Sequence, residues 1–224
     1  MSTISTSKKD LMLFQKKMLG LSGFFLVPFA ILFGLIGGDS NPSGWWHSIS
    51  MTYYANSNIC MIGVLFSMSV LFFSYLGYGT SDRIMTFIAG MSALGILVFP
   101  CGYEGLEITG LFGLQSHISK SIHYVFASML FLSFAVMVGY NFTRTSSDDI
   151  MTPEKKKRNT IYYTCSAIIV VFLLFKVVVS AFSLPEFLTL INEWIMLLAF
   201  SFAWLVKAEF FEFLNDKSVA ENIA

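Results

Sequence analysis

Long apolar stretches separated by short polar connections dominate the pattern of hydrophobic and polar positions along the chain. A helix needs about 17–25 residues to cross the hydrocarbon core of a membrane, and six stretches reach or approach that length. They cover approximately residues 19–36, 54–77, 84–100, 121–140, 161–182 and 187–206. Because the connections between them are short, the pattern predicts one unit of neighbouring antiparallel helices without a soluble domain.

The composition favours a membrane protein over a soluble domain. Of the 224 residues, 55% are hydrophobic and only 12% are charged, whereas soluble chains carry about 25% charged residues. The mean hydropathy is +0.69. We therefore expect an all-α membrane protein consisting of a single six-helix transmembrane bundle. Its expected parts are a basic N-terminal segment at 1–18, the helices at 19–208 and a C-terminal tail at 209–224.

The positions of lysine and arginine predict the orientation of this bundle. Twelve of the fourteen basic residues fall on the side that holds both chain ends, in residues 8–17, in the second and fourth connections, and after the last helix. Cytoplasmic segments carry such an excess of Lys and Arg, so we expect both termini to be cytoplasmic. The first apolar run is too long for a signal peptide, and we interpret it as a retained anchor.

A polar stretch at residues 45–58 enters the second apolar segment and is the first candidate for function. If the chain is helical from about Ser50, then Ser50, Tyr54 and Asn58 share one face at a spacing of four residues. Polar side chains that face lipid are costly. We therefore expect this face to point into the protein or into water, although the stretch does not name a substrate.

Two charges inside the apolar segments, Lys176 and Glu193, predict an ion pair. Each lies six residues from the outer end of its segment, roughly 9 Å deep at a rise of about 1.5 Å per residue. Either charge alone in lipid costs several kcal/mol. His123, Tyr54 and Asn58 fall near the same level, so five side chains from four segments share one outer layer. The alternatives are a structural pair that pins the last two helices together, a Lys176 that extends outward, or a pair within a ligand site.

The ligand types that zinc accepts occur on the outer side. They are His47, His117 and His123, with Asp39, Glu104 or Glu193 as a further ligand. The spacing argues against a shared zinc site, because His117 and His123 are six residues apart and face different sides of a helix. No H-x-x-x-H or H-E-x-x-H motif occurs. We expect no cofactor, with zinc as the alternative.

A hydrolase interpretation uses the same layer. Ser48 or Ser50 would be the nucleophile, His123 the base and Glu193 the carboxylate that orients the base. The residue types suffice for this chemistry, but no G-x-S-x-G motif surrounds either serine. Outside this layer, Gly63, Gly90 and Gly95 predict close approach of neighbouring helices, and the glycine-rich connection at 102–116 permits either a cover or a re-entrant turn.

Three short islands resemble a known group of proteins. They are Ser48-Ile49-Ser50 with Tyr53-Tyr54, the stretch at 95–100, and Ile122-His123. Together they resemble the uncharacterised bacterial multi-pass membrane families grouped as DUF998, and more distantly the Frag1/DRAM/Sfk1 group. The resemblance implies a six-helix bundle in a bacterial inner membrane and no established activity. Ser50, Pro100 and His123 match its motifs.

A weaker similarity is to membrane hydrolases of the ceramidase and adiponectin-receptor type, which place a zinc among histidines, an aspartate and a serine. This chain departs from that group because it lacks the paired-histidine spacing, has six predicted helices where seven are usual, and places its histidines on the outer side. These departures argue against a zinc site of that type.

Two hypotheses from different classes follow. The first is a binding or sensing membrane protein whose outward-facing pocket binds a lipid headgroup or small polar molecule. Its expected ligand-binding residues are Ser50, Tyr54, Asn58, His123, Lys176 and Glu193. The second is an intramembrane hydrolase, metal-dependent or not, of a lipid amide or ester, and a further alternative is a structural partner of another membrane protein. Expected partners are membrane lipids, a second copy or another membrane protein, and no nucleic acid, because the basic run at 155–158 is typical of contact with anionic lipid.

Overall fold

The computed structural model describes residues 2–37, 47–103, 105–144 and 151–216, and most of them are helical. The α-helices are α1 (Ser2–Ile36), α2 (Asn58–Ser74), α3 (Thr80–Val98), α4 (Ser116–Val136), α5 (Pro153–Ala181) and α6 (Phe187–Lys207). Short elements within the described chain are the 3-10 turns η2 (Ser50–Tyr54) and η4 (Glu212–Leu214), a π turn η3 (Met137–Asn141) that continues α4, and the strands β1 (Ile108–Thr109) and β2 (Leu114–Gln115).

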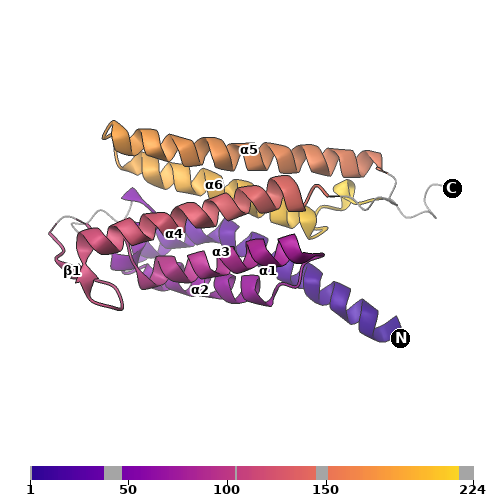
Figure 1. The fold of residues 1–224 in the computed structure, drawn as a ribbon, viewed down its shortest axis with the longest axis horizontal. Helices are drawn as coiled ribbons and strands as arrows, with labels where there is room; N and C mark the ends of the chain where they lie inside the picture. The colour runs from indigo at the N-terminus through magenta and orange to yellow at the C-terminus, as the bar shows by residue number, and fades with distance from the viewer. Residues whose placement is uncertain (1, 38–46, 104, 145–150, 217–224) are drawn as a thin grey trace.

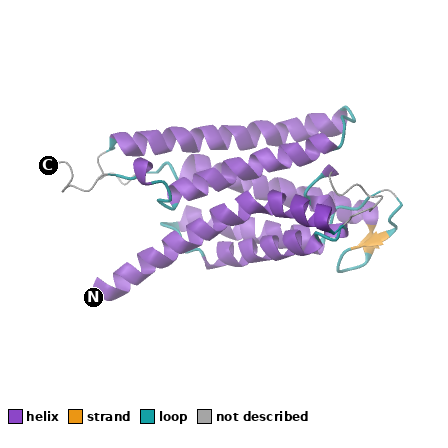
Figure 2. Ribbon diagram, turned by 180° about the vertical axis from the view of Figure 1, so that it is seen from behind, coloured by secondary structure: helices purple, strands orange, loops and turns teal. Residues whose placement is uncertain are grey.

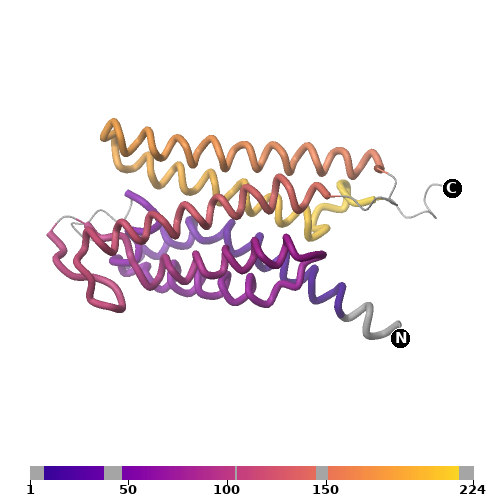
Figure 3. Tube along the Cα trace, viewed as in Figure 1, coloured from indigo at the N-terminus to yellow at the C-terminus, as the bar shows by residue number. Residues whose placement is uncertain are grey.

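The helices lie side by side in an elongated bundle (Figure 1). In sequence order, α1 packs against α2, α2 against α3, α3 against α4, α4 against α5 and α5 against α6, while α6 also packs against α1. Strands β1 and β2 lie at one end of the bundle, as the view from behind also shows (Figure 2). The start of α1 and the turn η4 lie at the other end, where α1 extends past its neighbours (Figure 3).

Five helices are long and apolar enough to cross a membrane: α1, α3, α4, α5 and α6. Helix α2 is apolar but has only 17 residues. The prediction of a helical, multi-pass membrane chain is confirmed at this level. The last predicted segment, 187–206, agrees most closely with its helix, Phe187–Lys207. The fifth helix begins at Pro153, before the predicted segment at 161–182. It begins there because Thr152 caps the helix by accepting a hydrogen bond from the Lys155 N–H.

Buried aromatic rings form the centre of the bundle. Phe72 of α2, Phe134 of α4 and both Phe200 and Trp204 of α6 are almost completely buried. The rings of Phe134 and Phe200 stack with centroids 3.8 Å apart. Lipid tails are as apolar as these side chains, so close packing rather than exclusion of water must hold such helices together.

The predicted close approaches occur at two of the three glycines. A Cβ atom at Gly95 of α3 would lie 2.3 Å from the Phe126 ring of α4, and one at Gly90 would lie 2.8 Å from the Phe73 ring of α2. A side chain at either position would therefore displace the neighbouring ring. The same prediction is wrong for Gly63, where a Cβ would have no neighbour within 4 Å.

The largest departure from the sequence pattern is the entry to α2. The condition of a continuous helix through Ser50, Tyr54 and Asn58 is not met, because the 3-10 turn η2 ends at Tyr54 and the backbone of the next residue, Ala55, is extended with φ −95° and ψ 168°. Short polar side chains satisfy the backbone locally here and compete with an α-helix. Ser48 Oγ accepts from the Met51 N–H, and Thr52 Oγ donates to the Ile49 carbonyl.

Candidate functional site

His123 of α4 lies inside the bundle, is only 1% exposed, and uses both ring nitrogens. Its Nδ1 atom is 2.9 Å from the Phe99 carbonyl oxygen, and its Nε2 atom is 2.9 Å from Ser50 Oγ. A carbonyl oxygen can only accept, so Nδ1 carries the proton in this arrangement, and a neutral ring accepts the Ser50 hydroxyl at Nε2. The result is an oriented Ser50–His123 pair.

The predicted ion pair between Lys176 of α5 and Glu193 of α6 is present. Lys176 Nζ is 2.6 Å from Glu193 Oε1, and the side chains are 25% and 5% exposed. The second carboxylate oxygen, Oε2, accepts from the Ile49 N–H at 2.8 Å. Lys176 Nζ also lies 5.8 Å from the centroid of the Tyr124 ring. Both oxygens of this buried carboxylate are therefore satisfied.

Residues 49 and 50 join these two groups. Ile49 donates its N–H to Glu193, and the next residue, Ser50, contacts His123 through its side chain. The expectation that Glu193 orients His123 is wrong, because the group that holds the imidazole is the Phe99 carbonyl. Sequence reasoning missed both Ile49 and Phe99 because each acts through its backbone, which leaves no signal in the residue type.

Tyr54 and Asn58 do not point into this layer together. Tyr54 shares a 2.7 Å hydrogen bond between its hydroxyl and that of Thr109 in β1, and its ring packs edge-on against Tyr103 with centroids 5.0 Å apart. Burial raises the pKa of Tyr54 to about 12, so its hydroxyl stays protonated at neutral pH. Asn58 is exposed as the first residue of α2, so the expected shared face is wrong.

The connection before α4, for which the sequence permits either a cover or a re-entrant turn, forms a β-hairpin. Ile108 pairs with Gln115 and Thr109 pairs with Leu114. Gly110 and Gly113 have φ angles of +76° and +58°, a region that favours glycine. Three exposed side chains of the hairpin are large and apolar, namely Ile108, Leu111 and Phe112.

A pocket of about 650 Å³ lies between this hairpin and the start of α4. Its polar lining includes Tyr103, Glu107, Gln115, His117 and Lys120, with Leu106 and Ile108 as apolar lining. Ser50, His123, Lys176 and Glu193 do not line it, so the structure separates a surface pocket from the buried layer that the sequence predicts. The pocket was missed because the hairpin that forms part of its lining is not apparent from helical spacing.

The Tyr124 ring lies between the pocket and the buried layer, whereas the Tyr103 ring contacts Tyr54, which lies outside that layer. Tyr103 lines the pocket and contacts Tyr54. Lys120 also lines the pocket, and its Nζ atom lies 6.0 Å from the centroid of the Tyr124 ring. Lys176 approaches that same ring. The Tyr124 ring therefore separates the charge of Lys120 in the pocket from the Lys176–Glu193 pair.

The three histidines have different surroundings. His47 forms an ion pair with Glu186, His117 lines the pocket, and His123 contacts Phe99 and Ser50. Asp39 and Glu104, proposed as further zinc ligands, lie outside the described residues. Within the described ranges, no three His, Cys, Asp or Glu side chains are grouped so that they could hold a metal ion.

Comparisons with known proteins identify no relative. No family model matches the chain, no curated protein matches it, and no solved structure matches it. The resemblance to the DUF998 group therefore stays a prediction.

Proposed function

We propose that the chain binds an amphiphilic ligand, most simply a phospholipid, at the hairpin end of the bundle. The observation that carries the proposal is the pocket of about 650 Å³ with charged lining beneath an apolar hairpin. Ligand pockets commonly enclose about 300–1,000 Å³ and combine apolar walls with a few polar groups. The polar headgroup would occupy the pocket while the acyl chains lie against Ile108, Leu111 and Phe112.

The charges in the pocket favour a headgroup that carries both signs. Lys120 supplies an ammonium group for a phosphate oxygen, and Glu107 supplies a carboxylate for an amine. Phosphoethanolamine has this combination. The Tyr124 ring lies between Lys120 of the pocket and Lys176 of the buried layer, and Tyr54 fixes the hairpin through Thr109.

The orientation belongs to the same proposal. The bundle would cross a bacterial inner membrane six times, with α2 as the shortest crossing and with both chain ends in the cytoplasm. The excess of Lys and Arg on that side supports this orientation, and the hairpin and pocket would then face the outer leaflet.

Substitutions in the pocket test the proposal. Purified protein in detergent is titrated with dioleoylphosphatidylethanolamine, and its thermal stabilisation is measured, because a ligand that binds the folded state raises the melting temperature. Lys120→Gln and Glu107→Gln should each weaken apparent binding about tenfold, since hydrogen bonds to charged groups contribute roughly 1.5–3 kcal/mol.

The matched control is Lys156→Gln, which removes an exposed charge near the start of α5, at the other end of the bundle. It should leave the titration unchanged. Dioleoylglycerol, which lacks the headgroup, should not stabilise the wild type. Equal stabilisation by both lipids, or equal loss in the control, would reject the proposed pocket.

A second candidate function, an intramembrane hydrolase, is favoured by the Ser50–His123 pair. Nε2 of His123 would take the Ser50 hydroxyl proton as Oγ attacks the carbonyl carbon of a lipid ester or amide. The protonated imidazole would then give that proton to the departing alcohol or amine, and water would release the acyl group from Oγ. The Phe99 carbonyl would hold the ring in place throughout.

This candidate makes a separate prediction. Hydrolysis of a fluorogenic lipid ester by the wild type should fall at least about 10³-fold in Ser50→Ala, because the covalent step is lost. Ser121→Ala changes an exposed serine of α4 and serves as the control. An inert wild type, or turnover that survives Ser50→Ala, eliminates the hydrolase while leaving lipid binding intact.

A further inference from the structure

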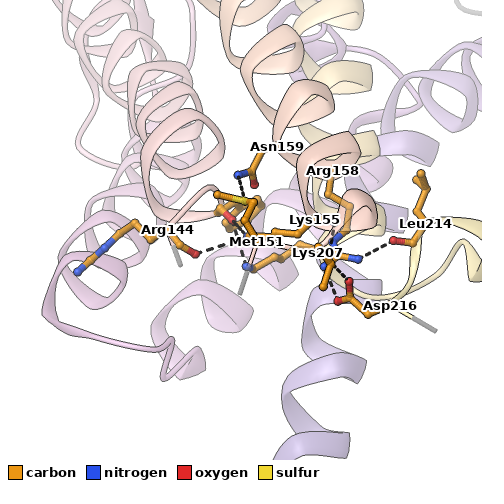
Figure 4. Close-up of polar contacts among 10 residues, drawn as sticks. Arg144, Met151, Lys155, Arg158, Asn159, Lys207, Leu214 and Asp216 are labelled. Carbon is orange, nitrogen blue, oxygen red and sulfur yellow. Dashed lines mark hydrogen bonds and ion pairs between the residues drawn. The ribbon is translucent and has the colours of Figure 1, made fainter. Parts of the chain in front are cut away.

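Basic side chains from three helices meet at the end of the bundle opposite the hairpin. We call Lys16, Lys155, Arg158 and Lys207 the basic cluster. Figure 4 shows three of its members, Lys155, Arg158 and Lys207, close together. The Phe142 carbonyl oxygen accepts from Lys155 Nζ at 3.1 Å and from Lys207 Nζ at 3.3 Å. The two ammonium groups are therefore at most two hydrogen-bond lengths apart.

Tyr78 brings the fourth cation into the cluster. Lys16 of α1 is only 2% exposed and donates from Nζ to the Tyr78 hydroxyl at 2.8 Å. The Nζ atoms of Lys16 and Lys207 lie 4.9 Å and 5.3 Å from the centroid of the Tyr78 ring. Lys16 and Lys207 thus share the Tyr78 ring, while Lys207 and Lys155 share the Phe142 carbonyl.

Among the residues that the structure describes, the cluster has fewer carboxylates than cations. Within the described residues the ion pairs are His47–Glu186, Arg158–Asp216 and Lys176–Glu193, so Arg158 is the one cluster member that has such a partner. Asp82, the other carboxylate near Lys207, accepts from the Tyr78 N–H at 2.7 Å. The three lysines contact neutral carbonyls, a phenol and aromatic rings instead. Buried charges are normally paired, so this arrangement favours an added anion.

We infer that the basic cluster binds a phosphate-bearing anion. Each ammonium group has three donors, and in the described contacts Lys155 uses two of them and Lys207 uses one. Lys155, Arg158 and Lys207 are partly exposed and would donate to the phosphate oxygens. Lys16 is buried on the Tyr78 ring that it shares with Lys207, and it adds positive charge. The anion is either the headgroup of an anionic lipid in the adjacent leaflet or a soluble phosphate compound.

Asp216 occupies part of this site. Its Oδ2 atom is 2.6 Å from Arg158 Nη2, and Arg158 Nη1 donates to the Leu214 carbonyl at 2.6 Å. Although burial alone raises it, hydrogen bonds from Arg158 and Thr152 lower the pKa of Asp216 below its ordinary value. Asp216 therefore stays ionised at neutral pH and competes with an added anion for Arg158.

The test titrates the full chain in detergent with dioleoylphosphatidate, dioleoylphosphatidylcholine or inorganic phosphate and measures thermal stabilisation. Phosphatidate, which carries a net negative charge, should stabilise the wild type more strongly than phosphatidylcholine, whose headgroup carries both signs. Lys155→Gln and Lys207→Gln should each weaken apparent phosphatidate binding about fivefold, the contribution of one basic residue to contact with anionic lipid. Asp216→Asn should strengthen it, because Arg158 becomes available.

Lys156→Gln and Lys157→Gln are matched controls, because they remove exposed charges from the same turn of α5. If they weaken binding as much as Lys155→Gln, general surface charge explains the result and the site is rejected. Stabilisation by inorganic phosphate as strong as that by phosphatidate supports the site and identifies its ligand as soluble. No stabilisation by either probe overturns the inference, as does weaker binding in Asp216→Asn, which keeps every cation of the cluster.

Discussion

Lys176→Met is expected to destabilise the folded protein by about 3–5 kcal/mol, the usual effect of removing one partner of a buried ion pair. Glu193 would remain 5% exposed and charged, with the Ile49 N–H as its remaining described partner. The measurement is the free energy of unfolding in mixed detergent micelles. The cost arises from the charge left behind rather than from the lost contact.

The double variant Lys176→Met/Glu193→Gln isolates that cause. An amide at position 193 is neutral and its oxygen can still accept from the Ile49 N–H, so the double variant should recover most of the lost stability. If the double variant is as unstable as the single one, the buried charge is not the reason. Stability equal to that of the wild type in Lys176→Met would show that Glu193 is not held as described.

Phe200→Ala is expected to lose about 3–5 kcal/mol of stability, as is typical for a buried aromatic residue replaced by alanine. Phe200 is fully buried and stacks on Phe134, and its ring also contacts Phe72 and Trp204. Truncation therefore opens a cavity where α2, α4 and α6 meet. The same unfolding measurement reports the loss.

Phe202→Ala provides the comparison on the same helix. Phe202 is 41% exposed, so its truncation should change the free energy of unfolding by about 0.5 kcal/mol or less. A similar loss in both variants would contradict the assignment of Phe200 to the centre of the bundle and Phe202 to its surface.

Chain length and apolarity predict most of the fold because hydrocarbon leaves few alternatives to a helix. The Lys176–Glu193 ion pair is also predictable, because an unpaired charge in hydrocarbon is costly. Two opposite charges at equal depth on consecutive helices are therefore expected to form an ion pair. The expected helix at residues 50–58 does not form, because Ser48 and Thr52 form hydrogen bonds with nearby backbone groups. A pattern of apolar positions does not reveal such bonds. Gly110 and Gly113 indicate a turn, but nothing in their spacing indicates the pocket beside the base of the hairpin.

The partners of the buried layer were less predictable than its members. Residue type and depth predict that His123 and Glu193 belong to this layer, yet in the structure they contact the backbone of Phe99 and Ile49 rather than each other. Every residue has a backbone N–H or carbonyl group that could form such a bond. The sequence therefore does not indicate which distant backbone group contacts His123 or Glu193. A direct bond between His123 and Glu193 was the natural expectation, and the intervening 48–50 segment replaces it.

Native mass spectrometry of the full chain tests the central claim most directly, namely that the pocket beneath the hairpin holds a lipid headgroup. After incubation with dioleoylphosphatidylethanolamine, the wild type should retain bound lipid, and the Lys120→Gln/Glu107→Gln variant should release it at the same collision energy. Equal retention by the wild type and the variant, with a folded variant, would contradict the account.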